Sequence, residues 1–117
     1  MNTNSPYMHE RLDAYAAALA FYRIVRAVRS NLPRGLGPLG DQISRAAQSI
    51  CLNLAEGAAA RSRDVKRRHY DIALGSAGEC SAALDLLEIE AAASADQLSG
   101  ARDHLRVATL RMLGLVR

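Results

Sequence analysis

Aromatic side chains are scarce in this sequence, because none of its 117 residues is tryptophan and one is phenylalanine. Half of the chain is nonetheless hydrophobic, and much of that half is alanine and leucine. A chain of this length is expected to form one domain. A core of small aliphatic side chains favours helices that approach one another closely. The composition therefore predicts a single helical domain.

Signals for secretion, membrane insertion and cysteine chemistry are missing as well. The first ten residues, MNTNSPYMHE, lack the apolar core of a secretory signal, and no apolar run approaches the length of a membrane span. Two cysteines are present, Cys51 and Cys80, and their spacing fits neither a metal knuckle nor a redox pair. We expect reduced core thiols in a cytoplasmic protein.

The chain has 15 basic and 12 acidic residues, and Lys66 is the one lysine among the basic ones. Arginine suits phosphate and carboxylate recognition, although a GC-rich genome produces the same bias without any function. The net charge of +3 is therefore a weak guide to partners.

Hydrophobic periodicity predicts four helices and no strand. The first is expected over residues 9–31, where it meets the Pro- and Gly-rich segment LPRGLGPLGD. The second is expected from Asp41, a candidate N-cap, to about Gly57, and the third from residue 62 or 63 to about 92. The fourth begins at Ser94, where Ser-Ala-Asp-Gln fits a capping box.

Each predicted helix has an apolar stripe that can enter a common core. The clearest stripes, in the third and fourth helices, are Tyr70, Ala73, Ala77, Cys80, Leu84 and Leu87, and Leu98, Ala101, Leu105, Ala108, Met112 and Leu115. This pattern predicts an all-α, antiparallel up-down-up-down four-helix bundle over residues 9–117. Residues 1–8 are expected to form a disordered or extended tail.

Apolar residues on two of the helices exceed what one bundle core needs. The first helix carries two adjoining stripes, Leu12/Tyr15/Leu19/Tyr22 and Ala18/Phe21/Val25/Val28, and the fourth has Val107, Leu110 and Leu113 beside its main stripe. Large exposed apolar patches usually mark interfaces. We therefore expect the protein to form a homo-oligomer.

Polar residues are arranged unusually on the second and third helices. Arg45, Ser49, Asn53 and Glu56 lie within about a quarter-turn of one another on the second helix. In the third, Glu79 follows the small-residue run GSAG, and two glycines inside a helix indicate that another helix comes close. Because a buried carboxylate needs a partner, we predict that Glu79 is buried and bonded to the second helix, with Arg45 the favoured partner. The alternative is a solvated face.

These motifs carry a family resemblance. The chain resembles a bacterial family of four-helix bundles in two groups of residues, Arg45-Ala46, Ser49-Ile50, Asn53 and Ala55-Glu56-Gly57, then Ile72-Ala73, Gly75-Ser76 and Glu79. The first members were found encoded in intervening sequences of large-subunit ribosomal RNA genes, and the family includes the accessory variability determinants of diversity-generating retroelements. The resemblance spans about Leu12 to Leu115.

The resemblance implies an antiparallel four-helix bundle that assembles into a ring-like homopentamer. The retroelement members are basic scaffolds that bind a reverse transcriptase and nucleic acid. Two positions depart from the family pattern: Cys51 stands where many members have Pro, and Ala60 stands where Arg is frequent. The first predicts a straighter second helix, and the second weakens a direct transfer of nucleic-acid binding.

The polar set of Arg45, Ser49, Asn53, Glu56 and Glu79 is interpreted as structural or as part of a subunit interface. Ligand contacts and a solvated face remain the alternatives.

We expect no catalytic residue, metal or cofactor. None of His9, His69 and His104 is preceded by the Glu-x-x-His pattern of a metal-binding bundle. Phosphate loops, nucleophile elbows and zinc knuckles have no counterpart either. We therefore predict that the protein is not an enzyme, and that His69 and His104 are exposed or flank a helix.

The densest charge lies in RSRDVKRRH, from Arg61 to His69, at the predicted start of the third helix. The helix dipole is positive there, so the cations are mildly unfavourable and a bound phosphate would offset that cost. The candidate nucleic-acid-binding residues are Arg61, Arg63, Lys66, Arg67 and Arg68. Helix packing is not expected to need them, and a solvated helix end is the alternative.

Two functions remain. One is a scaffold that binds RNA or DNA, and the other is a protein–protein adaptor without nucleic-acid binding. The expected partners are further copies of the chain and a reverse transcriptase or another protein, with no membrane.

Overall fold

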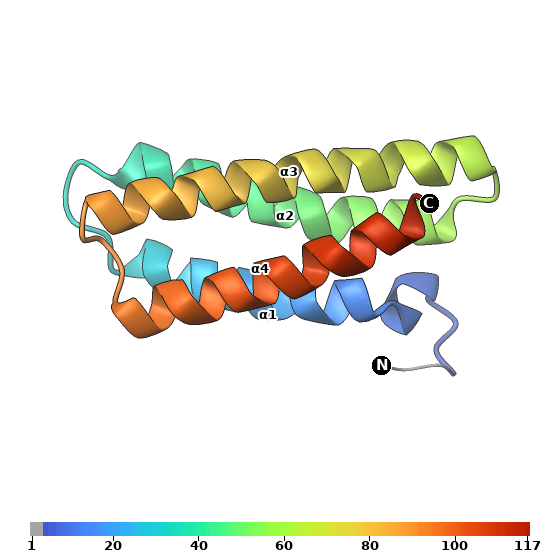
Figure 1. Cartoon of the computed structure of the whole chain (residues 1–117), viewed down its shortest axis with the longest axis horizontal. Helices are drawn as coiled ribbons and strands as arrows, with labels where there is room; N and C mark the ends of the chain where they lie inside the picture. Colours follow the sequence, from blue (N-terminus) through green and yellow to red (C-terminus); the bar gives the residue numbers. More distant parts are fainter. Residues whose placement is uncertain (1–3) are drawn as a thin grey trace.

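The computed structural model describes residues 4–117, which form four helices packed side by side, each running opposite to the one before it (Figure 1). A short 3-10 helix precedes them. The elements are η1 (Met8–Arg11), α1 (Asp13–Ser30), α2 (Gly37–Ala59), α3 (Arg63–Ile89) and α4 (Ala95–Leu115). Residues 4–117 contain no strand. The predicted all-α four-helix bundle is confirmed.

A continuous core of small and medium side chains lies between the helices, as the composition predicted. Its largest fully buried members are Phe21, Val25, Ile43, Ile50, Leu54, Cys80, Leu87 and Met112. Alanines from all four helices join them: Ala18, Ala47, Ala77 and Ala108. The predicted stripes of α3 and α4 are buried throughout, apart from Leu115 in the last turn of α4.

The N-terminal boundary of α1 differs from the prediction. The helix begins at Asp13 rather than near residue 9, because Leu12 has an extended backbone and separates α1 from η1. Ser5 is buried, and its carbonyl oxygen accepts hydrogen bonds from the Arg11 guanidinium at 3.1 and 2.9 Å. Of the tail predicted over residues 1–8, residues 1–3 lie outside the described range.

Two other boundaries shift for local reasons. α2 begins at Gly37 instead of Asp41, because Pro38 lies in its first turn, where the missing N–H of proline leaves no hydrogen bond unmade. α3 ends at Ile89 with Ala91 in the left-handed region (φ +52°), and the Ala92 amide donates to the Leu87 carbonyl at 2.9 Å. The predicted capping box is confirmed, since Ser94 exchanges both hydrogen bonds with Gln97 at the start of α4.

The helices are not equally close to one another. α3 packs most extensively on α2 and α1 on α4, whereas α3 and α4 pack least extensively among successive helices. One end of the bundle brings together the end of α2, the start of α3 and the end of α4 (Figure 1, right). Among residues 4–117, no helix combines the length and the apolarity needed to cross a membrane.

Candidate nucleic-acid interface

Four of the five candidate basic residues are exposed around the first turns of α3: Arg61, Arg63, Arg67 and Arg68. Ser62 is the N-cap, and its hydroxyl accepts a hydrogen bond from the Val65 amide at 3.3 Å. Within residues 4–117 these four guanidinium groups make no ion pair and no hydrogen bond. They therefore present unpaired positive charge at the positive end of a helix dipole, with Asp64 as the acidic residue of the first turn.

Lys66 has a different role from its neighbours. It is half-buried, and its ammonium group donates to the carbonyl oxygens of Gly57 at 3.0 Å and Ala58 at 2.8 Å. Carbonyl groups in the last turn of a helix lack partners inside the helix. Lys66 thus caps α2 from α3 and stabilises the tight connection between them. The expectation that packing does not need Lys66 is wrong.

A concave site of about 270 Å³ lies at this end of the bundle, between the start of α3 and the end of α4. Arg63 and Arg67 line it from α3, and Arg117, which follows α4, lines it from the other side. Apolar walls come from Leu115 and Val116. Arg117 was not among the candidates predicted from the sequence, because it is distant from the basic run along the chain. The antiparallel order of α3 and α4 would have placed it here.

Tyr70 also lines this concave site, and the residue is 5% exposed. The ring packs on Gly57 of α2, where an added Cβ would come within 2.5 Å of it. Gly57 therefore allows α2 and α3 to approach closely. Burial raises the pKa of Tyr70, so its hydroxyl stays protonated at neutral pH.

A chain of polar side chains joins α2 to α3 beside the basic cluster. Ser76 of α3 donates to the Ser49 hydroxyl at 2.8 Å, and the Asn53 side-chain nitrogen donates to the Ser49 hydroxyl at 3.1 Å and to its carbonyl at 2.9 Å. Because this nitrogen is the donor, the Asn53 side-chain oxygen faces His69 as an acceptor, 2.9 Å from Nδ1. The imidazole therefore carries its proton on Nδ1.

His69 completes the chain by approaching Glu56. Its Nε2 lies 3.4 Å from the Glu56 carboxylate, and the His69 side chain is 19% exposed. A polar layer between α2 and α3 is thus present, with His69 as the member that sequence reasoning left out. His69 was expected to be exposed or to flank the helix, yet it is partly buried inside this layer.

Glu79 is not part of that layer, and the prediction of a buried pair with Arg45 is wrong. Both residues are exposed, and no hydrogen bond or ion pair joins them within residues 4–117. The predicted bond to α2 is present with another partner, because the Glu79 carboxylate accepts a long hydrogen bond of 3.4 Å from Gln42. Ile72 and Leu86, seven residues to either side, are exposed too, so this stripe of α3 faces outward rather than into the core.

The glycines next to Glu79 do not mark a close approach within the chain. A Cβ added at Gly75 or Gly78 would meet no atom within 4 Å. The prediction that another helix of the same chain comes close here is therefore wrong. The closest approaches occur at Gly57, described above, and at Gly40, where an added Cβ would meet Leu32 and Arg29; at Gly100 it would lie 3.2 Å from Ile24.

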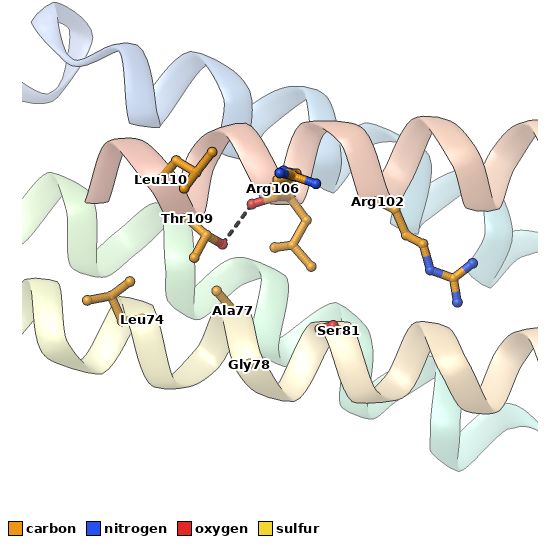
Figure 2. Close-up of a pocket in the computed structure, with 9 residues that line it drawn as sticks. Leu74, Ala77, Gly78, Ser81, Arg102, Arg106, Thr109 and Leu110 are labelled. Carbon is orange, nitrogen blue, oxygen red and sulfur yellow. Dashed lines mark hydrogen bonds between the residues drawn. The ribbon is translucent and has the colours of Figure 1, made fainter. Parts of the chain in front are cut away.

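An open groove of about 430 Å³ separates α3 from α4 (Figure 2). Gly78 and Leu74 lie on its α3 side, and Leu110 and Arg106 on its α4 side. Arg102 at its end is held by Glu88 at 2.8 Å and Asp85 at 3.1 Å. The groove is mainly apolar, and it exists because α3 presents small residues toward a more distant α4.

Exposed apolar side chains flank the groove and the outer side of α3. They are Val107, Leu110 and Leu113 on α4, as predicted, and Ile72, Leu86 and Ile89 on α3. On α1 the second predicted stripe is buried, and the first, with Tyr15 and Tyr22, packs partly against the core. The large exposed apolar side chains of the described helices therefore lie mainly on α3 and α4, with Leu52 on α2, rather than on α1.

Both thiols are buried. Burial raises the pKa of Cys51 to about 11 and, together with the nearby charge of Glu79, raises that of Cys80 to about 12. Neither is a thiolate at neutral pH, so neither is an activated nucleophile. Among residues 4–117, no group of three or more His, Cys, Asp or Glu side chains is arranged to hold a metal ion.

Comparison with known proteins bears on the whole chain. A search of curated proteins gives no significant match. The family model described as 23S rRNA-intervening sequence protein matches residues 10–113, which include all four helices apart from the last two residues of α4. The match covers the polar layer and the start of α3 alike. With nearly the full length matched, the chain belongs to the 23S rRNA-intervening sequence protein family.

Proposed function

We propose that this protein is a non-enzymatic, cytoplasmic, homo-oligomeric scaffold that binds nucleic acid through the basic end of its bundle. The observation that carries the proposal is the group of four exposed arginines at the start of α3, Arg61, Arg63, Arg67 and Arg68, none of which is paired within residues 4–117. Such a group repels itself and the helix dipole, and phosphate relieves both repulsions.

Arginine is suited to this task, because its planar guanidinium binds phosphate oxygens through two parallel hydrogen bonds. Contacts of this kind go to the backbone of the nucleic acid and carry little sequence information. A structured RNA or an RNA–DNA intermediate would therefore be recognised by charge and shape rather than by base edges.

Assembly would multiply these contacts. The groove between α3 and α4, with the exposed Val107, Leu110 and Leu113 of α4, forms the surface through which copies of the chain would associate, and the family resemblance points to a pentamer. Five basic ends on one particle would bind one nucleic acid more tightly than any single end does.

A protein–protein adaptor is the second candidate. The groove between α3 and α4 favours it, since a mainly apolar groove beside exposed leucines also suits a helix of another protein. A reverse transcriptase or another protein would then be the partner, with no nucleic acid bound by this chain itself.

Two triple variants with equal charge separate these functions. Arg63→Gln/Arg67→Gln/Arg68→Gln removes three charges from the basic end, and Arg23→Gln/Arg26→Gln/Arg34→Gln removes three exposed arginines elsewhere. Fluorescence anisotropy with labelled RNA and DNA should show that the first variant loses binding and the second retains most of it. Light scattering should give the same oligomer for all three proteins. Equal losses in both variants would refute binding through the basic end.

A further inference from the structure

The concave site between α3 and α4 combines three features that belong together in an anion site. Arg63 and Arg67 are one helical turn apart and share a face of α3. Arg117 approaches from the end of α4, so positive groups line the site from two elements. Leu115 and Val116 form apolar walls beside these charged groups.

The Tyr70 hydroxyl provides an independent indication of a ligand. Tyr70 is 5% exposed, yet its hydroxyl makes no hydrogen bond within residues 4–117. In that range, Ser44 Oγ is the one fully buried side-chain nitrogen or oxygen without a hydrogen-bond partner. The unpartnered Tyr70 hydroxyl is therefore not fully buried. Because the hydroxyl keeps access to the surface and Tyr70 lines the concave site, an acceptor bound there would take its hydrogen bond in place of solvent.

We propose that this concave site binds one phosphate group of a nucleic-acid strand, held by Arg63, Arg67 and Arg117 and accepting a hydrogen bond from the Tyr70 hydroxyl. The inference rests on the proposed function and adds its specific contact point. Lys66 lines the same site, but its ammonium group is committed to the carbonyl oxygens of Gly57 and Ala58, so it holds the walls in place rather than the phosphate.

The site also explains which basic residues matter most. Arg61 and Arg68 do not line it, although they belong to the same exposed cluster. They contribute to the general attraction of the basic end, which falls off with salt. Arg63 and Arg67 contribute that attraction and direct contacts as well.

Tyr70→Phe is the most specific test, because it removes one hydroxyl and leaves charge and ring packing unchanged. Anisotropy with a labelled RNA strand and with a DNA strand of the same sequence should show about tenfold weaker binding for the variant, the effect of a hydrogen bond to a charged group. If both strands lose affinity equally, the contact is to the phosphate that they share. A loss with RNA alone would contradict a phosphate contact and assign the hydroxyl to the ribose.

A second comparison uses two variants with equal charge, Arg63→Gln/Arg67→Gln and Arg61→Gln/Arg68→Gln. The first should weaken binding at least tenfold more than the second, with helicity and oligomer size unchanged. Suppose that the wild type binds, that both double variants lose affinity equally, and that Tyr70→Phe binds like the wild type. The phosphate site is then refuted, while the basic-end proposal stands. If the wild type has no salt-sensitive affinity at all, the proposed function fails first.

Discussion

The side-chain oxygen of Asn53 lies 2.9 Å from Nδ1 of His69, and this contact joins α2 to α3 at the centre of their polar layer. Asn53 is held in turn by Ser49, so its orientation is determined on both sides. A polar residue of α2 thereby satisfies a partly buried imidazole of α3. This relationship connects the family motif to the fold, since Asn53 belongs to that motif.

Asn53→Ala should lower the free energy of unfolding by about 1 to 3 kcal/mol, because it leaves His69 without its acceptor in a partly buried place. Gln42→Ala is the matched control on the same helix, since the 3.4 Å bond from Gln42 reaches an exposed carboxylate. Its effect should stay within about 0.5 kcal/mol. Urea unfolding of both variants measures the difference, and equal effects would contradict a structural role for Asn53.

Lys66→Met should destabilise the bundle by about 1 to 2 kcal/mol, because the carbonyl oxygens of Gly57 and Ala58 lose their cap while the apolar stem is kept. Arg67→Met, one position further on, removes the same charge from an exposed side chain and should change stability by less than about 0.5 kcal/mol. Thermal unfolding monitored by circular dichroism distinguishes the two. A Lys66 variant as stable as the Arg67 variant would show that the cap contributes nothing.

Gly57→Ala and Gly78→Ala should change stability in opposite directions. At Gly57 the new methyl group would lie 2.5 Å from the Tyr70 ring. Overpacking should therefore lower the free energy of unfolding by about 1 to 3 kcal/mol, which outweighs the gain in helix propensity. At Gly78 nothing lies within 4 Å, so a gain of up to about 1 kcal/mol remains. Urea unfolding of the two variants measures both changes, and a stabilised Gly57 variant would contradict the close packing of Tyr70.

Gly78 also reports on assembly, because it lines the groove between α3 and α4. If another copy of the chain fills that groove, Gly78→Ala should weaken the oligomer although it stabilises the single bundle. Light scattering over a dilution series measures this. An oligomer as stable as the wild type would place the subunit contact elsewhere.

Both thiols should resist modification in the folded protein. The pKa values of about 11 for Cys51 and about 12 for Cys80 leave almost no thiolate at pH 8, whereas an unfolded thiol titrates near pH 9.0. Because the folded values are raised, this contribution to stability is present below pH 9 and is lost as pH rises toward 11 and 12. A disulfide reagent should react slowly at pH 8 and quickly after denaturant is added. Rapid reaction of the native protein would contradict the buried positions.

The parts of the fold that follow from local patterns could be predicted. Periodicity located the helices and core stripes, and the spacing of Ser94 and Gln97 identified the start of α4. The seven-residue spacing of Ile72, Glu79 and Leu86 showed that they share a face, but not that the face is exposed. That depends on which stripe of α3 enters the core, and the better apolar stripe through Cys80 and Leu84 does so.

The concave site and the polar layer could be predicted only in part. The basic cluster was visible as a run of residues, but Arg117 joins it through the packing of α4 beside α3. His69 was one residue among several in that run, and its bond to Asn53 depends on the register between α2 and α3. Lys66 resembles its neighbours in the sequence, and its capping role depends on the end of α2 lying beside it.

The measurement that tests the central claim most directly is the salt dependence of nucleic-acid affinity for the wild-type oligomer. Anisotropy with labelled RNA and DNA, recorded between about 50 and 200 mM salt, should show affinity falling linearly on a log–log plot, by several powers of ten if about six or more phosphates are contacted. RNA and DNA should behave alike, because the basic end contacts the backbone. No affinity for either at the lowest salt, or an affinity independent of salt, would contradict the scaffold and leave the protein adaptor in its place.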